Sequence, residues 1–227
     1  MAGWLVGFPF TSAPISLFLA LDYGTAFAAA TARGSIGSVI AQAAFALAYS
    51  RARGLGAPIA LAGATLAFAG TGFLVGSVEA TPALLTAAAW TVLAIAIRLM
   101  PITQRQATGP IAPPMWDLPA RIIVATALVF AITSAAIVLG PFNSGLVSGF
   151  PLYATVLAVF AHRVAGPDAA SDVMRGLLAG LFGFATFFLV IAGTLETLGI
   201  FGSFGLASAT ILVVQGISFA LLRRGSG

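Results

Sequence analysis

The sequence predicts an all-α membrane protein with about eight transmembrane helices. Of its 227 residues, 60% are hydrophobic and 7% are charged, and the mean hydropathy is +1.08. A soluble domain has about 25% charged residues, so a water-soluble enzyme or nucleic-acid module is excluded. The apolar residues also form long continuous runs, and the arginines gather in alternate connections between those runs.

A transmembrane helix requires about 20 apolar residues, because the hydrocarbon core of a bilayer is about 30 Å thick. Charges, prolines and glycine clusters divide the chain into eight runs: 4–21, 25–49, 57–77, 82–99, 119–139, 144–161, 172–195 and 200–222. The connection at 101–118 is proline-rich and predicts a cytoplasmic linker. It separates a first membrane half, residues 1–100, from a second half, residues 119–227.

The charges predict the orientation of these runs. If the eight runs cross in alternate directions, nine of the ten arginines fall on the same side as the N-terminus. Basic loops stay in the cytoplasm, so both termini are expected there. This distribution accounts for the net charge of +4 without a nucleic-acid partner, and it favours an integral protein of the bacterial cytoplasmic membrane.

An internal repeat is suggested by a shift of 142 positions. This shift aligns Gly7-Phe8-Pro9 with Gly149-Phe150-Pro151, and Arg33-Gly34 with Arg175-Gly176. Over residues 7–46, ten of forty positions are identical. The first copy begins in the first run and the second in the sixth, so helices 1–3 and 6–8 are predicted to be inverted copies. Inverted repeats are typical of secondary transporters, although duplicated membrane proteins without transport activity also exist.

Candidate binding residues surround the two copies of Gly-Phe-Pro. Prolines inside a membrane helix free backbone groups, which are tolerated where they line a wet cavity, and matched broken helices indicate a transporter's substrate site. The alternative is an ordinary proline kink. The predicted substrate-binding residues at the two breaks are Pro9, Thr11, Ser12, Pro14, Asn143, Ser148, Pro151 and Tyr153.

Arg33 is the one arginine that does not fall on the side of the N-terminus, because it lies inside the second run. A charged side chain within the membrane usually faces a cavity or a partner. Its guanidinium is suited to a carboxylate or phosphate, which predicts a role in binding an anionic solute. A snorkelling or ion-paired Arg33 is the structural alternative. Its counterpart Arg175 is expected near the opposite face, paired with Asp168 or Asp172.

The acidic residues give little support to ion coupling. No acid is predicted at the middle of the membrane, where a proton or sodium relay would place one. Asp22 and Glu196, at outer helix ends, are the weak candidates for that role. The chain has no cysteine and one histidine, His162, so no metal site and no cofactor are expected.

These patterns together predict a transporter of a small polar, anionic organic solute that works by alternating access, and no enzyme motif is present. The alternatives are an accessory or structural membrane subunit, a channel, or a membrane-embedded enzyme acting on a lipid. The expected partners are the solute and the bilayer. Glycine stripes, such as Gly34 with Gly37 and Gly72 with Gly76, are expected to pack helices within the chain, with a homo-oligomer seam as the alternative.

Overall fold

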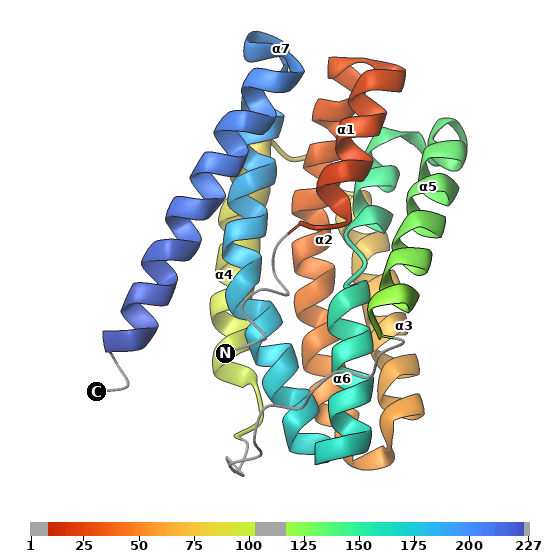
Figure 1. Cartoon of the computed structure of the whole chain (residues 1–227), viewed down its shortest axis with the longest axis vertical. Helices are drawn as coiled ribbons and strands as arrows, with labels where there is room; N and C mark the ends of the chain where they lie inside the picture. The colour runs from red at the N-terminus through yellow and green to blue at the C-terminus, as the bar shows by residue number, and fades with distance from the viewer. Residues whose placement is uncertain (1–8, 103–116, 225–227) are drawn as a thin grey trace.

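The computed structural model describes residues 9–102 and 117–224, and this part of the chain is helical without a strand. Its elements run along the long axis of one bundle (Figure 1). They are α1 (Ser12–Tyr23), α2 (Thr25–Ala52), the short 3-10 helix η2 (Arg53–Leu55), α3 (Ala57–Gly76), α4 (Pro82–Leu99), α5 (Asp117–Ser148), α6 (Leu152–Ala165) and α7 (Pro167–Arg224).

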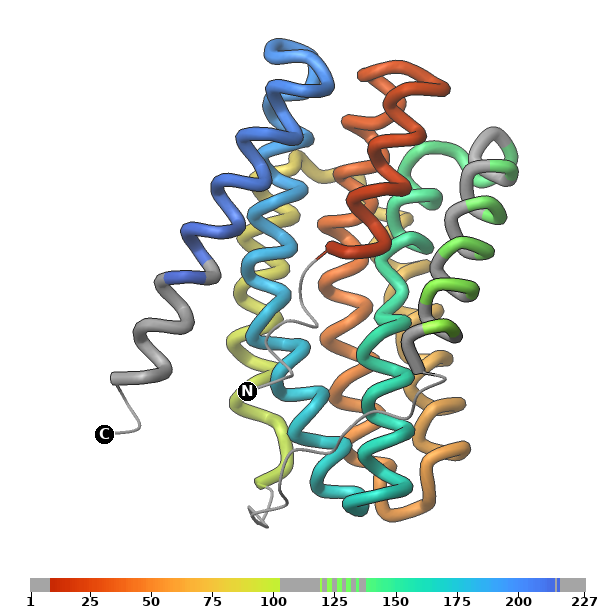
Figure 2. Tube along the Cα trace, viewed as in Figure 1, coloured from red at the N-terminus to blue at the C-terminus, as the bar shows by residue number. Residues whose placement is uncertain are grey.

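Two of these helices reverse direction at a glycine. Gly140 in α5 has φ 74° and Gly199 in α7 has φ 67°, a backbone region that glycine enters without a steric penalty. Figure 2 shows the chain folding back at both places. Helix α5 therefore consists of runs 117–139 and 141–148, and α7 consists of runs 167–198 and 200–224.

Several helices are suited to a bilayer. Among the described residues, three are long and apolar enough to cross it, namely Ala57–Gly76, Pro82–Leu99 and Pro167–Val214, and the last contains the reversal at Gly199. The bent pair Val138–Ser148 and Leu152–Ala165 makes a fourth if it counts as one span. Large apolar side chains face outward, with Phe73 80% exposed and Phe201 85% exposed. These features are compatible with an integral membrane protein.

The break expected at the Gly-Phe-Pro segment within the run 144–161 is present, because the helices Val138–Ser148 and Leu152–Ala165 meet there at an angle of 41°. The interruption expected at Pro14 is not present. Helix α1 begins only at Ser12, so Pro14 lies in its first turn and does not interrupt it. The first backbone N–H groups of a helix have no internal partner, and a proline there breaks no hydrogen bond. Residues 1–8 and most of the predicted linker, 103–116, lie outside the described residues.

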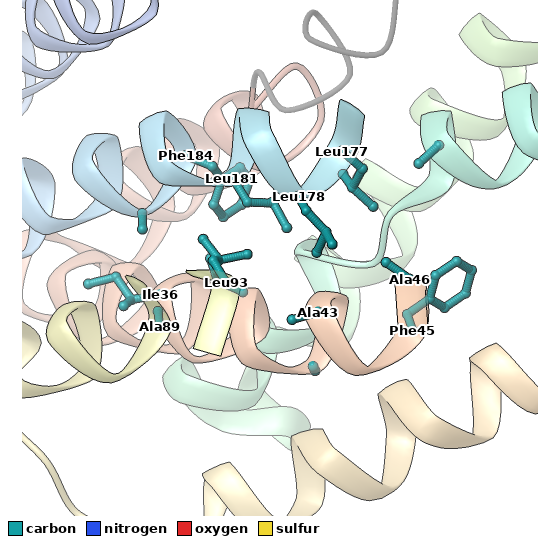
Figure 3. Close-up of a cluster of buried hydrophobic side chains, with 14 of the residues drawn as sticks. Ile36, Ala43, Phe45, Ala46, Ala89, Leu93, Leu177, Leu178, Leu181 and Phe184 are labelled. Atoms are coloured by element: carbon teal, nitrogen blue, oxygen red, sulfur yellow. The ribbon is translucent and has the colours of Figure 1, made fainter. Parts of the chain in front are cut away.

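The apolar core lies where α2, α4 and α7 meet. Figure 3 shows Ile36 and Ala43 of α2 beside Leu93 of α4, facing Leu178 and Leu181 of α7. Each of these side chains is at most 1% exposed. Helix α2 is also in contact with α1, α3 and α5, which makes it the central helix of the bundle.

A second contact joins α2 to the short run 141–148 through glycines. A Cβ on Gly34 would overlap the carbonyl group of Phe142, and a Cβ on Gly145 would overlap that of Thr31. On the neighbouring helix α3, a Cβ on Gly72 would lie 2.8 Å from the Leu146 side chain. The prediction that these glycines pack helices within the chain is confirmed for Gly34 and Gly72. We call this contact between α2 and residues 141–148 the glycine-serine seam.

Candidate functional site

Three helix ends meet halfway along the bundle. Helix α1 begins there at Ser12, the run 141–148 ends there, and α6 begins there at Leu152 (Figure 1). The Ser12 hydroxyl donates a hydrogen bond to the carbonyl oxygen of Ser148 at 2.7 Å, and both residues are buried. Because each of these helices covers only part of the bundle's length, backbone groups come together in its interior.

A cavity of about 20 Å³ lies at this junction. That is room for about one water molecule. Its walls come from α1, α2, the Gly-Phe-Pro segment, α6 and α7. The lining residues are Thr11, Gln42, Gly149, Phe150, Pro151, Leu152, Tyr153, Ala154, Leu177, Leu181 and Phe184.

The Gly-Phe-Pro segment makes this break in a defined way. A Cβ on Gly149 would overlap the hydroxyl of Ser38, so only glycine lets the chain pass this close to α2. Pro151 has φ −78° and ψ 61°, outside the helical region, and its carbonyl oxygen accepts the Thr155 N–H at 2.9 Å to start α6. The break between residues 141–148 and α6 therefore has two causes, the close packing of Gly149 against α2 and the non-helical backbone of Pro151.

Gln42 supplies the polar side chain on the α2 wall. It is 3% exposed, and its Nε2 donates to the Ser38 hydroxyl at a distance of 3.4 Å. Its role in the cavity was not predicted from the sequence. An uncharged amide between the alanines Ala41 and Ala43 was the available signal, but spacing alone does not show which neighbour it meets.

The electrostatic character of the cavity comes from helix ends. The N-terminal ends of α1 and α6 both contribute lining residues, at Thr11 and at Pro151 to Ala154. A helix N-terminus carries a partial positive charge and exposed N–H donors. The lining includes no carboxylate and no histidine. The site is therefore suited to hold a polar or negatively charged group.

The structure brings some predicted binding residues together and separates others. Thr11, Pro151 and Tyr153 line the cavity, while Ser12 and Ser148 form the hydrogen bond beside it. The remaining predicted residues at the breaks lie elsewhere. Asn143 is exposed and donates to the Leu139 carbonyl, whereas Pro9 and Pro14 line a separate groove.

Arg33 does not line the cavity in this structure. Its guanidinium donates from Nη2 to the Ala80 carbonyl oxygen at 3.2 Å, in the connection between α3 and α4. Asp168, one of the two acids expected to pair with Arg175, instead accepts a hydrogen bond from the Nε of Arg53 at 3.0 Å.

The two acids proposed for ion coupling also lie away from the cavity. Asp22 and Glu196 are both exposed, near the end of α1 and near the end of the run 167–198. Neither contributes to the cavity lining.

An apolar groove of about 440 Å³ lies beside the cavity, between α1 and α7. Its walls include Phe10 and Phe18 from the α1 side and Phe187 and Phe204 from α7. Phe10 packs edge-on against the cavity residue Tyr153, with 6.3 Å between ring centroids. This aromatic contact joins one residue of the groove lining to one residue of the cavity lining.

The part of the chain that the structure describes contains no group of three or more histidine, cysteine or acidic side chains that could hold a metal ion. Comparison with known proteins gives no further guidance: the sequence matches no family model and no curated protein, and the fold matches no solved structure.

Proposed function

We propose that this protein is a secondary transporter of a small polar solute, with an anionic solute favoured, and that the solute binds at the cavity between α1 and α6. One observation carries the proposal. The N-terminal ends of two short helices meet inside the bundle at a small cavity with a buried amide, Gln42. In transporters, half-helix N-termini of this kind bind anionic substrate groups near the middle of the membrane.

The proposal places eight membrane crossings along the chain. They are a first crossing that includes α1, then α2, α3, α4, 117–139, the bent pair of 141–148 with α6, 167–198 and 200–224. The 12 residues of α1 cover about 18 Å, so the first crossing would need the whole run expected at 4–21. Successive runs point in opposite directions along the bundle in Figure 1, which is what alternate crossing requires. An even number of crossings would put both termini on the same side of the membrane, and the arginine distribution favours the cytoplasm as that side.

Matching local geometry supports the inverted repeat. Gly24 ends α1 with φ 87° and ψ 171°, and Gly166, its partner at the shift of 142, ends α6 with φ 89° and ψ 177°. The Ala13 N–H donates to the Pro9 carbonyl at 2.9 Å, and the equivalent bond from Thr155 to Pro151 is also 2.9 Å. Two similar halves of opposite direction provide two near-equivalent conformations, one open to each side.

The size of the cavity indicates which conformation this structure represents. With about 20 Å³, the cavity holds one water molecule and no organic solute. We therefore interpret the structure as a closed conformation, in which solute binding requires the wall formed by α6 and α7 to move away from α1 and α2.

Ligand-dependent thermal stability tests this assignment first. The purified protein would be heated with small carboxylates, phosphates and neutral polar solutes, because a ligand that binds only the folded state raises its apparent stability. We expect one chemical class to raise the melting temperature, and the same class to be taken up by liposomes that contain the protein.

The Gln42→Met variant removes the amide and keeps the side chain's length, so it should abolish the stabilisation by that class of solute. The Thr91→Val variant, on the exposed face of α4, is the matched control and should retain it. Uptake no greater than in protein-free liposomes for every class would contradict transport.

The apolar groove favours a second candidate, a protein acting on a lipid. Its aromatic walls of Phe10, Phe18, Phe187 and Phe204 accommodate an acyl chain directly beside the cavity. A lipid-modifying enzyme would convert its substrate without solute flux, and among the cavity-lining side chains it would have the phenol of Tyr153 as its acid or base. An accessory subunit would show neither activity and would co-purify with a larger complex.

A further inference from the structure

Two arginines hold the two ends of α4 (Pro82–Leu99). Arg33 donates from Nη2 to the carbonyl oxygen of Ala80 at 3.2 Å. Arg175 donates from Nη2 to the carbonyl oxygen of Pro101 at 3.0 Å. Ala80 lies two residues before the first residue of α4, and Pro101 lies two residues after its last. Helix α4 is therefore bonded at equivalent places beyond its two ends, by α2 at one end and by α7 at the other.

The two arginines occupy equivalent positions in the proposed repeat. The shift of 142 that aligns the Gly-Phe-Pro segments also pairs Arg33 with Arg175, and hence α2 with the run 167–198. Helix α4 has no counterpart in this alignment and packs against both of those helices, with Leu93 between them in Figure 3. Each half of the molecule thus holds the shared helix at a different end.

The length of α4 places these bonds on opposite sides of a membrane. Its 18 residues span about 27 Å at about 1.5 Å per residue. That length is close to the thickness of the hydrocarbon core, about 30 Å. The carbonyls of Ala80 and Pro101 then lie at the two membrane surfaces, where water can replace a broken hydrogen bond. A bond of this kind is strong enough to hold a helix end and weak enough to open during a transport cycle.

The same two helices also form walls of the cavity. Gln42 belongs to α2, and Leu177 and Phe184 belong to α7. Separation of α2 from α4 at the Ala80 end, or of α7 from α4 at the Pro101 end, would displace one wall from that side only. Arg33 and Arg175 do not line the cavity, so they would act on access to the site and not on the solute itself.

We propose that the bonds Arg33–Ala80 and Arg175–Pro101 are the two latches of alternating access. Each closes the cavity toward one side of the membrane, and each opens in turn while the other remains closed. This inference rests on the proposed transport function. It assigns both arginines as positioning residues, and it replaces the expectation that Arg33 binds the solute directly.

Cysteine labelling tests the latches without knowledge of the solute. The natural sequence has no cysteine, so an Ala154→Cys substitution introduces a single reporter in the cavity lining. Its reaction with a membrane-impermeant maleimide would be measured from each side of sealed vesicles, in the otherwise natural protein and with Arg33→Gln or Arg175→Gln. A separate Glu79→Cys variant, at an exposed position next to Ala80, identifies which side of the membrane the Ala80 end faces.

We expect Arg33→Gln to raise the labelling rate from the Ala80 side by about tenfold, the size expected for losing one hydrogen bond to a charged group. Arg175→Gln should raise labelling from the Pro101 side by a similar factor. The two variants are matched controls for each other, because they make the same substitution at equivalent positions. Arg33→Lys and Arg175→Lys keep the charge with one shorter donor, and they should give intermediate rates even if a glutamine variant fails to fold.

The outcomes distinguish failure of the latch proposal from failure of the proposed transport function. If the reporter reacts from both sides but the arginine variants change the two rates equally or not at all, the latch proposal is wrong and alternating access stands. A reporter that never reacts from more than one side, in any variant, would contradict alternating access itself.

Discussion

Two faces of α2 are packed by different rules. The face toward α4 and α7 carries apolar side chains such as Ile36 and Ala43, fully buried in the core of Figure 3. The face toward residues 141–148 carries Gly34, Ser35 and Ser38, and there the Ser35 hydroxyl donates to the Gly145 carbonyl at 3.3 Å. One face is filled by side-chain volume, and the other is closed by the near approach of two backbones.

This difference shows which interactions stabilise the association of helices in a bilayer. Lipid tails are as apolar as leucine, so burial of apolar surface does not by itself hold helices together there. Close packing and interhelical hydrogen bonds remain. Substitutions that remove side-chain volume from the apolar core should therefore lower the free energy of unfolding. Substitutions that add volume in the glycine-serine seam should lower it as well.

The largest expected effect comes from enlarging a residue in the seam. In Gly145→Leu, the new Cβ would overlap the Thr31 carbonyl, which is backbone and cannot move aside. We expect a loss above the range of about 1–3 kcal/mol that overpacking usually costs. The measurement is the free energy of unfolding in mixed detergent micelles. Gly70→Leu, where a Cβ meets nothing within 4 Å, is the control and should be near neutral.

A smaller effect is expected from removing volume in the core. Leu93 is 0% exposed between α2 and α7, so Leu93→Ala should reduce the free energy of unfolding by about 2 kcal/mol, at the low end of cavity-creating substitutions. The same measurement on Leu66→Ala, at a site 73% exposed on α3, should show little change because lipid tails fill the space. Equal losses in both variants would mean that burial does not distinguish the core from the outer face.

The smallest expected effect concerns a single hydrogen bond at the junction of helix ends. Ser12→Ala removes the 2.7 Å bond to the Ser148 carbonyl, and interhelical bonds of this kind are worth about 0.6 kcal/mol in a membrane protein. The comparison variant is Ser77→Ala, whose hydroxyl bonds only to Leu74 in its own helix and should cost less. A loss for Ser12→Ala no larger than for Ser77→Ala would assign the junction's stability to packing alone.

The sequence by itself determined the class of the molecule and the positions of most helices. Low charge and continuous apolar runs predicted the all-helical membrane architecture, and the run at 82–99 coincides with α4. The prolines and glycines of the Gly-Phe-Pro segment predicted the break before α6. Hydrophobicity and the missing N–H group of proline are local features, because they act on the residues that carry them. The close approach of Gly149 to Ser38 is a tertiary contact, which the sequence does not show.

Only the tertiary structure decided which residues meet. Gln42 lines the cavity, whereas Arg33 donates to the Ala80 carbonyl oxygen outside it. Both residues are polar side chains within the apolar run of α2, so the sequence alone does not distinguish them. Hydropathy also ranks α2 below α3 and α4 as a membrane helix, yet α2 is the centre of the bundle. The physical reason is that an enclosed helix is held by close contacts with its neighbours, and those contacts allow glycine, serine and glutamine where a lipid-facing helix requires apolar side chains.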